Sequence, residues 1–118
     1  MRLVRGGPAS DRGAGDSGLS SDWLQGPASS PGSLDVGVVT LAPGVTTPLH
    51  MHLEGQVLMV TAGEGFVEAD GERLEIGPGD VVVAAPGEWH VHGANPRPTL
   101  VHVSVSTGGY EIAGPPPG

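Results

Sequence analysis

The five histidines of this 118-residue chain are the residues whose type and spacing could do chemistry. They form two pairs with one intervening residue, and a fifth stands alone: His50, His52, His90, His92 and His102. Side chains at positions i and i+2 of a β-strand point to the same face, so each pair would present two imidazoles together. Neutral imidazole is a common metal ligand, and near pH 7 it can also take and return a proton. The spacing therefore indicates metal binding, proton transfer, or both.

An ordinary structural role for these histidines is the alternative. A single histidine most often has a satisfied place in a core or on a surface. Two same-face pairs and a fifth histidine are harder to explain in that way, because neutral imidazoles buried without a partner are costly and a metal ion supplies a partner. We therefore favour a metal site.

The segment that carries the histidines is divided into short apolar runs by turn signals. Asp70-Gly71 is a strong two-residue hairpin signal, and Gly-Pro, Pro-Gly and Gly-Glu-Gly sequences separate the other runs. No stretch of about ten residues has helical periodicity. Strands are expected at 34–41, 49–52, 56–62, 66–69, 72–76, 81–85, 89–93 and 99–106. Short strands at this spacing predict an all-β sandwich or barrel.

Two of the expected strands contain runs that are apolar on both faces. Residues 57–60 (VLMV) and 81–83 (VVV) predict strands that are covered on both faces. An interior polar pocket is then the natural place for the histidines.

The composition indicates one domain with two extensions. Residues 1–33 have few apolar residues and predict a flexible leader, in which Trp23 and Leu24 could dock on the barrel or on a neighbouring subunit. Residues 34–107 are expected to form the barrel, and residues 108–118 a loose tail rich in glycine and proline.

Charge and composition exclude several partners. Thirteen acidic and five basic residues give a net charge of −8, which repels nucleic acid and anionic lipid surfaces alike. There is no cysteine for a disulfide, a thiolate metal site or a nucleophile. No apolar run has the length of a signal peptide or of a membrane span, so we expect a cytoplasmic protein.

Two segments resemble the paired motifs of a known family. Residues 44–63, which contain HMHLEGQ, and residues 77–90, which end in GEWH, resemble the first and second motifs of the cupins. The resemblance covers about residues 36–106 and implies a single-domain cupin, which is a jelly-roll barrel or double-stranded β-helix. Among cupins, the chain is especially similar to single-domain bacterial proteins that include manganese-dependent hydroxynitrile lyases.

The resemblance implies a ligand set for a divalent metal: His50, His52, Gln56 and His90. Glu54 is the alternative to Gln56, because it would share the face of His50 and His52 if the strand continued straight. The sequence Leu53-Glu54-Gly55 predicts a turn, however, which would interrupt this alternation. With Gln56 the site would keep a charge of about +2, which makes it a stronger Lewis acid than a site with glutamate. Manganese is the metal that the family favours, while iron, zinc, nickel or cobalt would also suit these ligands. On an octahedral ion, two positions would remain open for a substrate.

His92 and His102 remain after the ligands are assigned. Each is a candidate general base, and each could instead orient a ligand through a hydrogen bond. By resemblance to the lyases, both line the pocket, and His102 is the stronger candidate for the base.

The expected function is that of a metal-dependent enzyme that acts on a small organic substrate through Lewis-acid and histidine-base chemistry, as hydroxynitrile lyases do. The alternatives are an Fe(II) dioxygenase, a cyclase like those of polyketide synthesis, and a non-catalytic module that binds a small ligand. The resemblance also implies a homodimer or a higher oligomer.

Overall fold

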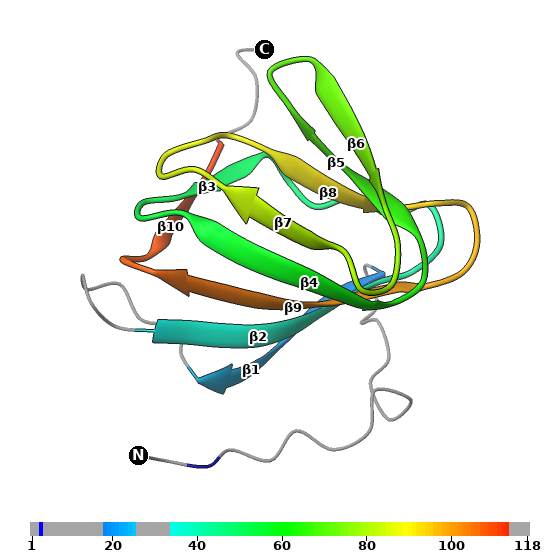
Figure 1. Cartoon of the computed structure of the whole chain (residues 1–118), viewed down its shortest axis with the longest axis horizontal. Helices are drawn as coiled ribbons and strands as arrows, with labels where there is room; N and C mark the ends of the chain where they lie inside the picture. The colour runs from blue at the N-terminus through cyan, green and yellow to red at the C-terminus, as the bar shows by residue number, and fades with distance from the viewer. Residues whose placement is uncertain (1–2, 4–17, 26–33, 114–118) are drawn as a thin grey trace.

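The computed structural model describes residue 3 and residues 18–25 and 34–113, which fold mainly as β-strands (Figure 1). The strands are β1 (Leu19–Gln25), β2 (Leu34–Leu41), β3 (His50–His52), β4 (Gln56–Ala62), β5 (Gly65–Ala69), β6 (Glu72–Ile76), β7 (Val81–Ala84), β8 (Val91–Ala94), β9 (Leu100–Thr107) and β10 (Tyr110–Ile112). Nowhere in the described residues is there a helix long and apolar enough to cross a membrane. The all-β prediction is confirmed.

The strands pair antiparallel in three sheets. The largest has the order β1-β2-β9-β4-β7, and the smaller ones have the orders β6-β5-β8 and β10-β3. Neighbours in a sheet are often distant in sequence, as β2 and β9 are, because the chain crosses repeatedly from one sheet to another. In Figure 1 the five-stranded sheet forms one wall and the smaller sheets close the other side, which is the arrangement of a jelly roll.

An apolar cluster fills one part of the interior between the sheets. Its largest members, Leu41, Leu58 and Leu100, are at most 1% exposed and come from β2, β4 and β9. Val60, Val67, Ile76 and Ala94 complete the cluster. Because side chains alternate along β4, Leu58 and Val60 point inward together with Gln56 at the start of the strand. The same strand therefore supplies both core and polar pocket.

The predicted flexible leader is wrong at one place. Leu19–Gln25 forms β1, which pairs with β2 from Leu19 opposite Leu41 to Gln25 opposite Val36. The sequence LSSDWLQ has no clear alternation of apolar residues, so its pairing depends on the hydrogen-bonding edge that β2 offers. The side chains of Trp23 and Leu24 lie outside the described residues, and their docking stays a prediction.

The predicted tail also contains a strand. Tyr110–Ile112 forms β10 and pairs with β3, with Tyr110 opposite His52 and Ile112 opposite His50. The chain reaches this position through Gly108 and Gly109, which have φ values of 79° and 85° that only glycine adopts easily. A prediction from composition alone missed this turn. Residues 114–118 lie outside the described residues.

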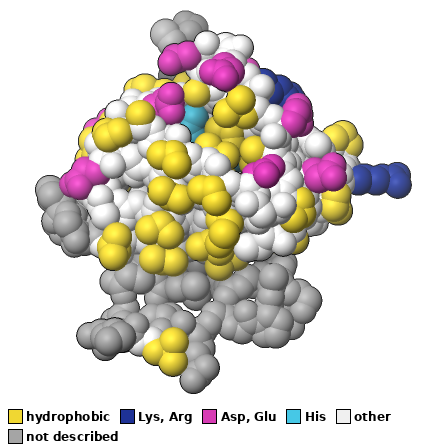
Figure 2. Space-filling model, viewed as in Figure 1, with side chains coloured by type: hydrophobic (Ala, Val, Ile, Leu, Met, Phe, Trp, Pro, Cys, Tyr) yellow, Lys and Arg dark blue, Asp and Glu magenta, His cyan; other side chains and the backbone are white. Residues whose placement is uncertain are grey.

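The valine-rich strands are covered on one face only. On β4 and β7 the side chains of Val57, Met59, Val81 and Val83 point away from the interior and are between 43% and 73% exposed. The prediction that both faces of these strands are covered is therefore wrong for the chain by itself. Figure 2 shows apolar side chains gathered on the face of the molecule where these strands lie. Association into a homodimer or higher oligomer stays a prediction.

Candidate metal centre

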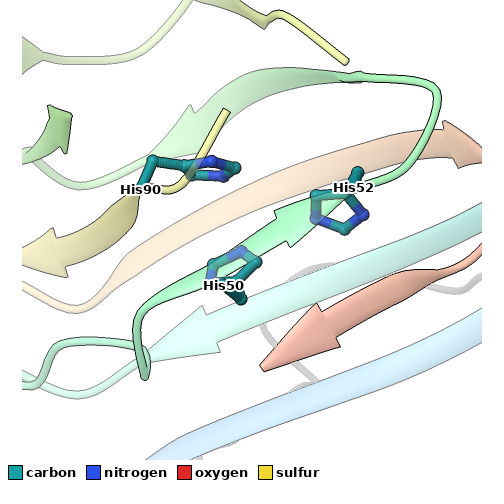
Figure 3. Close-up of side chains that lie close together, drawn as sticks. All are labelled: His50, His52 and His90. Carbon is teal, nitrogen blue, oxygen red and sulfur yellow. The ribbon is translucent and has the colours of Figure 1, made fainter. Parts of the chain in front are cut away.

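Three imidazoles converge inside the barrel, although His90 is about 40 positions from His50 and His52 in the sequence. His50 and His52 lie on β3, and His90 lies just before β8 on the chain segment opposite (Figure 3). The backbones of His50 and His90 bond to each other reciprocally, with N···O distances of 3.0 and 2.8 Å. One nitrogen from each of the three rings lies within 4.8 Å of the others. This spacing allows one ion to contact all three, since metal–nitrogen bonds are about 2 Å long.

Two backbone carbonyls set the proton positions on His50 and His90. The Nδ1 atoms of these rings lie 2.8 Å from the carbonyl oxygens of Pro48 and Glu88, respectively. A carbonyl oxygen can only accept, so Nδ1 must carry the proton and donate it. In the neutral rings the lone pair is then on Nε2. Each histidine is thus prepared to bind a cation through the same atom.

Gln56 brings a fourth lone pair to this place. Its Oε1 lies 3.0 Å from Nε2 of His90, while its Nε2 donates to Oγ of Ser104 at 2.5 Å. With Nδ1 of a neutral His90 protonated, Oε1 and Nε2 are two acceptors that face each other. Two buried acceptors in this position repel unless a cation lies beside them.

His52 is the member of the cluster with unsatisfied nitrogens. Both ring nitrogens are buried, and neither has a hydrogen-bond partner. Burial, and then the charges of His50 and His90, lower the pKa of His52 to about 4, so the ring is neutral at pH 7. Burial also lowers the pKa of His50, against the opposing effect of its bond to Pro48. A neutral, buried His52 ring without a partner fits a divalent metal ion, which would supply the missing partner.

Glu54 is directed elsewhere. Its carboxylate accepts a hydrogen bond from Oγ1 of Thr107 at 2.9 Å, near the surface, and its side chain lies against the turn at Gly108. The turn expected around residues 53–55 is present, with Gly55 at a φ of 92°. The structure therefore brings Gln56 rather than Glu54 to the three histidines.

His92 and His102 form a second histidine pair beside the first cluster. Nδ1 of His92 and Nε2 of His102 are 3.1 Å apart, so one donates to the other. The ring of His92 stacks on that of His90 at 4.9 Å between centroids. Burial, and then the neighbouring His102, hold the pKa of His92 well below its usual range. Burial, and then His50, lower the pKa of His102 to about 4. The outer nitrogens, Nε2 of His92 and Nδ1 of His102, have no hydrogen-bond partner.

A cavity of about 200 Å³ opens onto the first cluster. Its polar part is formed by His50, His52, Gln56, His92, Ser104, Ser21 and Thr47. His90 and His102 do not line it, although His102 is in hydrogen-bond contact with His92. The rest of the wall is largely apolar and comes from Leu19, Val39, Pro48, Tyr110 and Ile112. Three of these residues lie on β1 and β10, which the sequence did not predict. The alternation in GYEI between glycine and proline was a weak signal for β10.

The chain belongs to the cupin family. A family model described as the cupin domain matches residues 37–105, which include all of the histidines above. The fold agrees: a cupin-like protein from Thermotoga maritima superposes with a TM-score of 0.74 and 34% sequence identity, over 81% of this chain and 76% of that one.

Two curated enzymes each match more than half of the chain. An (R)-mandelonitrile lyase from Granulicella tundricola is 47% identical over 68 residues, which is 57% of this chain and 52% of the lyase. A gentisate 1,2-dioxygenase from Ralstonia sp. is 34% identical over 71 residues, or 59% of this chain and 20% of the dioxygenase. The chain thus spans about half the length of the first relative and a fifth of the second. The expected likeness to hydroxynitrile lyase-like cupins is confirmed.

Proposed function

We propose that this cupin is a metal-dependent enzyme that cleaves a small cyanohydrin to a carbonyl compound and hydrogen cyanide, and that His50, His52, Gln56 and His90 hold its metal. The observation that carries the proposal is the convergence of three imidazoles and the Gln56 amide oxygen, with the His92–His102 pair beside them and a cavity that opens onto His50, His52, Gln56 and His92. The similarity to the mandelonitrile lyase supports the choice of substrate class.

The ligand set favours Lewis-acid chemistry. Three neutral imidazoles and a neutral amide leave the charge of a bound divalent ion at +2, and such an ion would polarise the oxygen of a hydroxyl or carbonyl group. Manganese is the proposed metal. Nitrogen and oxygen ligands of this kind do not by themselves select it over iron, cobalt, nickel or zinc.

His92 is the proposed base because it is the member of the histidine pair that lines the cavity. When its Nδ1–H donates to Nε2 of His102, its own Nε2 carries a lone pair and can accept the hydroxyl proton of a cyanohydrin. The C–O bond then becomes a carbonyl as the C–CN bond breaks, and the electron pair leaves with cyanide. Cyanide takes the proton from His92 and departs as hydrogen cyanide.

His102 would act through His92. Its Nε2 accepts from Nδ1 of His92, which sets the tautomer of His92 and stabilises the ring when it is protonated. The sequence favoured His102 as the base, whereas the position of the cavity favours His92 for that role. The apolar wall would hold the body of the substrate and exclude water. A volume of about 200 Å³ suits a compound with one ring, since engineered cavities of about 150 Å³ bind benzene.

The test is the cleavage of mandelonitrile by purified protein loaded with Mn²⁺, followed through the absorbance of benzaldehyde. We expect His92→Ala to lower kcat by about 10² to 10⁴, the range of general-base catalysis. An unchanged rate in His92→Ala, with His102→Ala inactive, would move the base to His102. No cleavage of aliphatic or aromatic cyanohydrins with any of the five metals would overturn the lyase proposal.

A dioxygenase is the second candidate, and the similarity to gentisate 1,2-dioxygenase is the observation in its favour. The same four ligands would suit Fe(II), with open positions for substrate and oxygen. Oxygen consumption by Fe²⁺-loaded protein with gentisate would support this function. Cyanohydrin cleavage without oxygen consumption would exclude it.

A further inference from the structure

Ser104 has no assigned part in the site, yet it holds the amide of Gln56. It lies on β9, is 6% exposed, and accepts a hydrogen bond from Nε2 of Gln56 at 2.5 Å. In the pairing of β4 with β9, Ser106 is directly opposite Gln56 and Ser104 is opposite Leu58. Ser104 is therefore a diagonal neighbour of Gln56 on the inward face, within reach of its side chain.

A glutamine ligand has two ends, and only one of them can bind a metal. Oε1 has lone pairs, whereas Nε2 is a donor with two protons. When Oε1 turns toward the three histidines, as it does here, the NH₂ group is buried and needs an acceptor. In the opposite orientation NH₂ would donate to Nε2 of His90 and occupy the lone pair that the metal requires.

We infer that Ser104 is a positioning residue that keeps Gln56 in its metal-binding orientation by accepting the amide N–H. This inference rests on the proposed metal centre. Without the hydroxyl, the metal-facing amide leaves a buried N–H without a partner. The turned amide leaves only its carbonyl oxygen unsatisfied, because its NH₂ donates to His90, so the turned orientation is favoured. Metal binding must then reverse that turn, so the affinity decreases.

The experiment is a titration of the protein with Mn²⁺ in competition with a fluorescent chelator. We expect Ser104→Ala to raise the Kd for Mn²⁺ about 10- to 100-fold, as loss of a partner of a metal ligand does in other sites. Ser104→Thr keeps a hydroxyl and should bind nearly as the wild type does. Ser106→Ala is the matched control, because Ser106 is also inward-facing and 7% exposed on β9. It should leave the Kd within about twofold of the wild type.

A double mutant isolates the orientation effect. In Gln56→Ala no amide remains to be oriented, so adding Ser104→Ala should change the Kd by less than about threefold. The visible absorption of Co²⁺-loaded protein gives a second readout, and we expect it to change in Ser104→Ala but not in Ser106→Ala.

Three results separate this inference from the metal centre. If wild-type protein binds none of the metals, the centre itself is wrong. If wild type binds and Ser104→Ala binds equally well, only the role of Ser104 is wrong. An equal loss of affinity when Ser104→Ala is added to the wild type and to the Gln56→Ala variant also overturns it, because the loss is then unrelated to the amide.

Discussion

The interior of this barrel has an apolar part and a polar part, and the same strands build both. On β4, Gln56 belongs to the polar part and Leu58, two residues later on the same face, to the apolar cluster. On β9, Leu100 belongs to the cluster and His102 and Ser104 to the polar part. The members of the apolar part are all buried, whereas the polar part keeps imidazole nitrogens without partners beside a cavity. Stability and chemistry are thus separated by only one or two residues along a strand.

The polar part carries a cost in the metal-free protein. Each buried polar atom without a hydrogen bond costs about 1–3 kcal/mol, and His52 alone has two such nitrogens. The apolar cluster has to offset this cost. We therefore expect a substitution in the polar part to lower metal affinity without lowering stability. A substitution in the apolar part should lower stability and leave metal affinity nearly unchanged.

Loss of metal from the polar part should be the most pronounced change. His52→Ala removes one of three converging imidazoles, so we expect the affinity for Mn²⁺ to fall by more than about 100-fold and cyanohydrin cleavage to reach background. Elemental analysis after dialysis measures the loss. The metal-free variant should unfold at the same or a higher denaturant concentration than metal-free wild type. Retention of one equivalent of metal would remove His52 from the ligand set.

The matched substitution in the apolar part is Leu58→Ala. Leu58 is 1% exposed, so the cavity left behind should lower the free energy of unfolding by about 2–5 kcal/mol. Denaturant titration with a chelator present measures this change. The Mn²⁺ affinity of the folded variant should stay within about threefold of the wild type. A loss of affinity as large as that of His52→Ala would show that the two parts are not separable.

The pH dependence of stability tests the polar part without any substitution of the core. The pKa values of His52 and His102 are about 4, below the ordinary 6.5, so the unfolded chain binds more protons between these values. The free energy of unfolding of metal-free protein should therefore be highest above pH 6.5 and decrease as the pH falls toward 4. Thermal melting at a series of pH values measures this. In His52→Gln the decrease should be shallower, and identical profiles would contradict the assignment.

The weakest effect should come from Glu54, which lies next to the polar part but points away from it. Glu54→Gln should leave the Mn²⁺ affinity within about twofold, since its carboxylate bonds to Thr107 near the surface. Gln56→Ala is the comparison and should weaken binding strongly. If Glu54→Gln weakens binding more than Gln56→Ala does, the fourth ligand is Glu54.

Much of the site follows from local rules that a sequence carries. The i, i+2 spacing places His50 and His52 on one face of a strand wherever that strand lies. The turn at Gly55 interrupts the alternation of side chains, so that Gln56 rather than Glu54 faces the histidines. Short apolar runs between glycines and prolines predicted most of the strands within one or two residues of their observed ends. These features depend on neighbours in sequence, so they needed no tertiary information.

The rest was decided by contacts between distant segments. Strands β1 and β10 have little pattern of their own, and they form because β2 and β3 offer edges to pair with. The carbonyls that set the tautomers, the bond from Gln56 to Ser104 and the position of His92 before His102 arise from packing across the barrel. Five histidines on strands indicated a metal. Only the folded barrel determines which nitrogen of each ring faces the cavity, because that depends on which polar group lies on its other side.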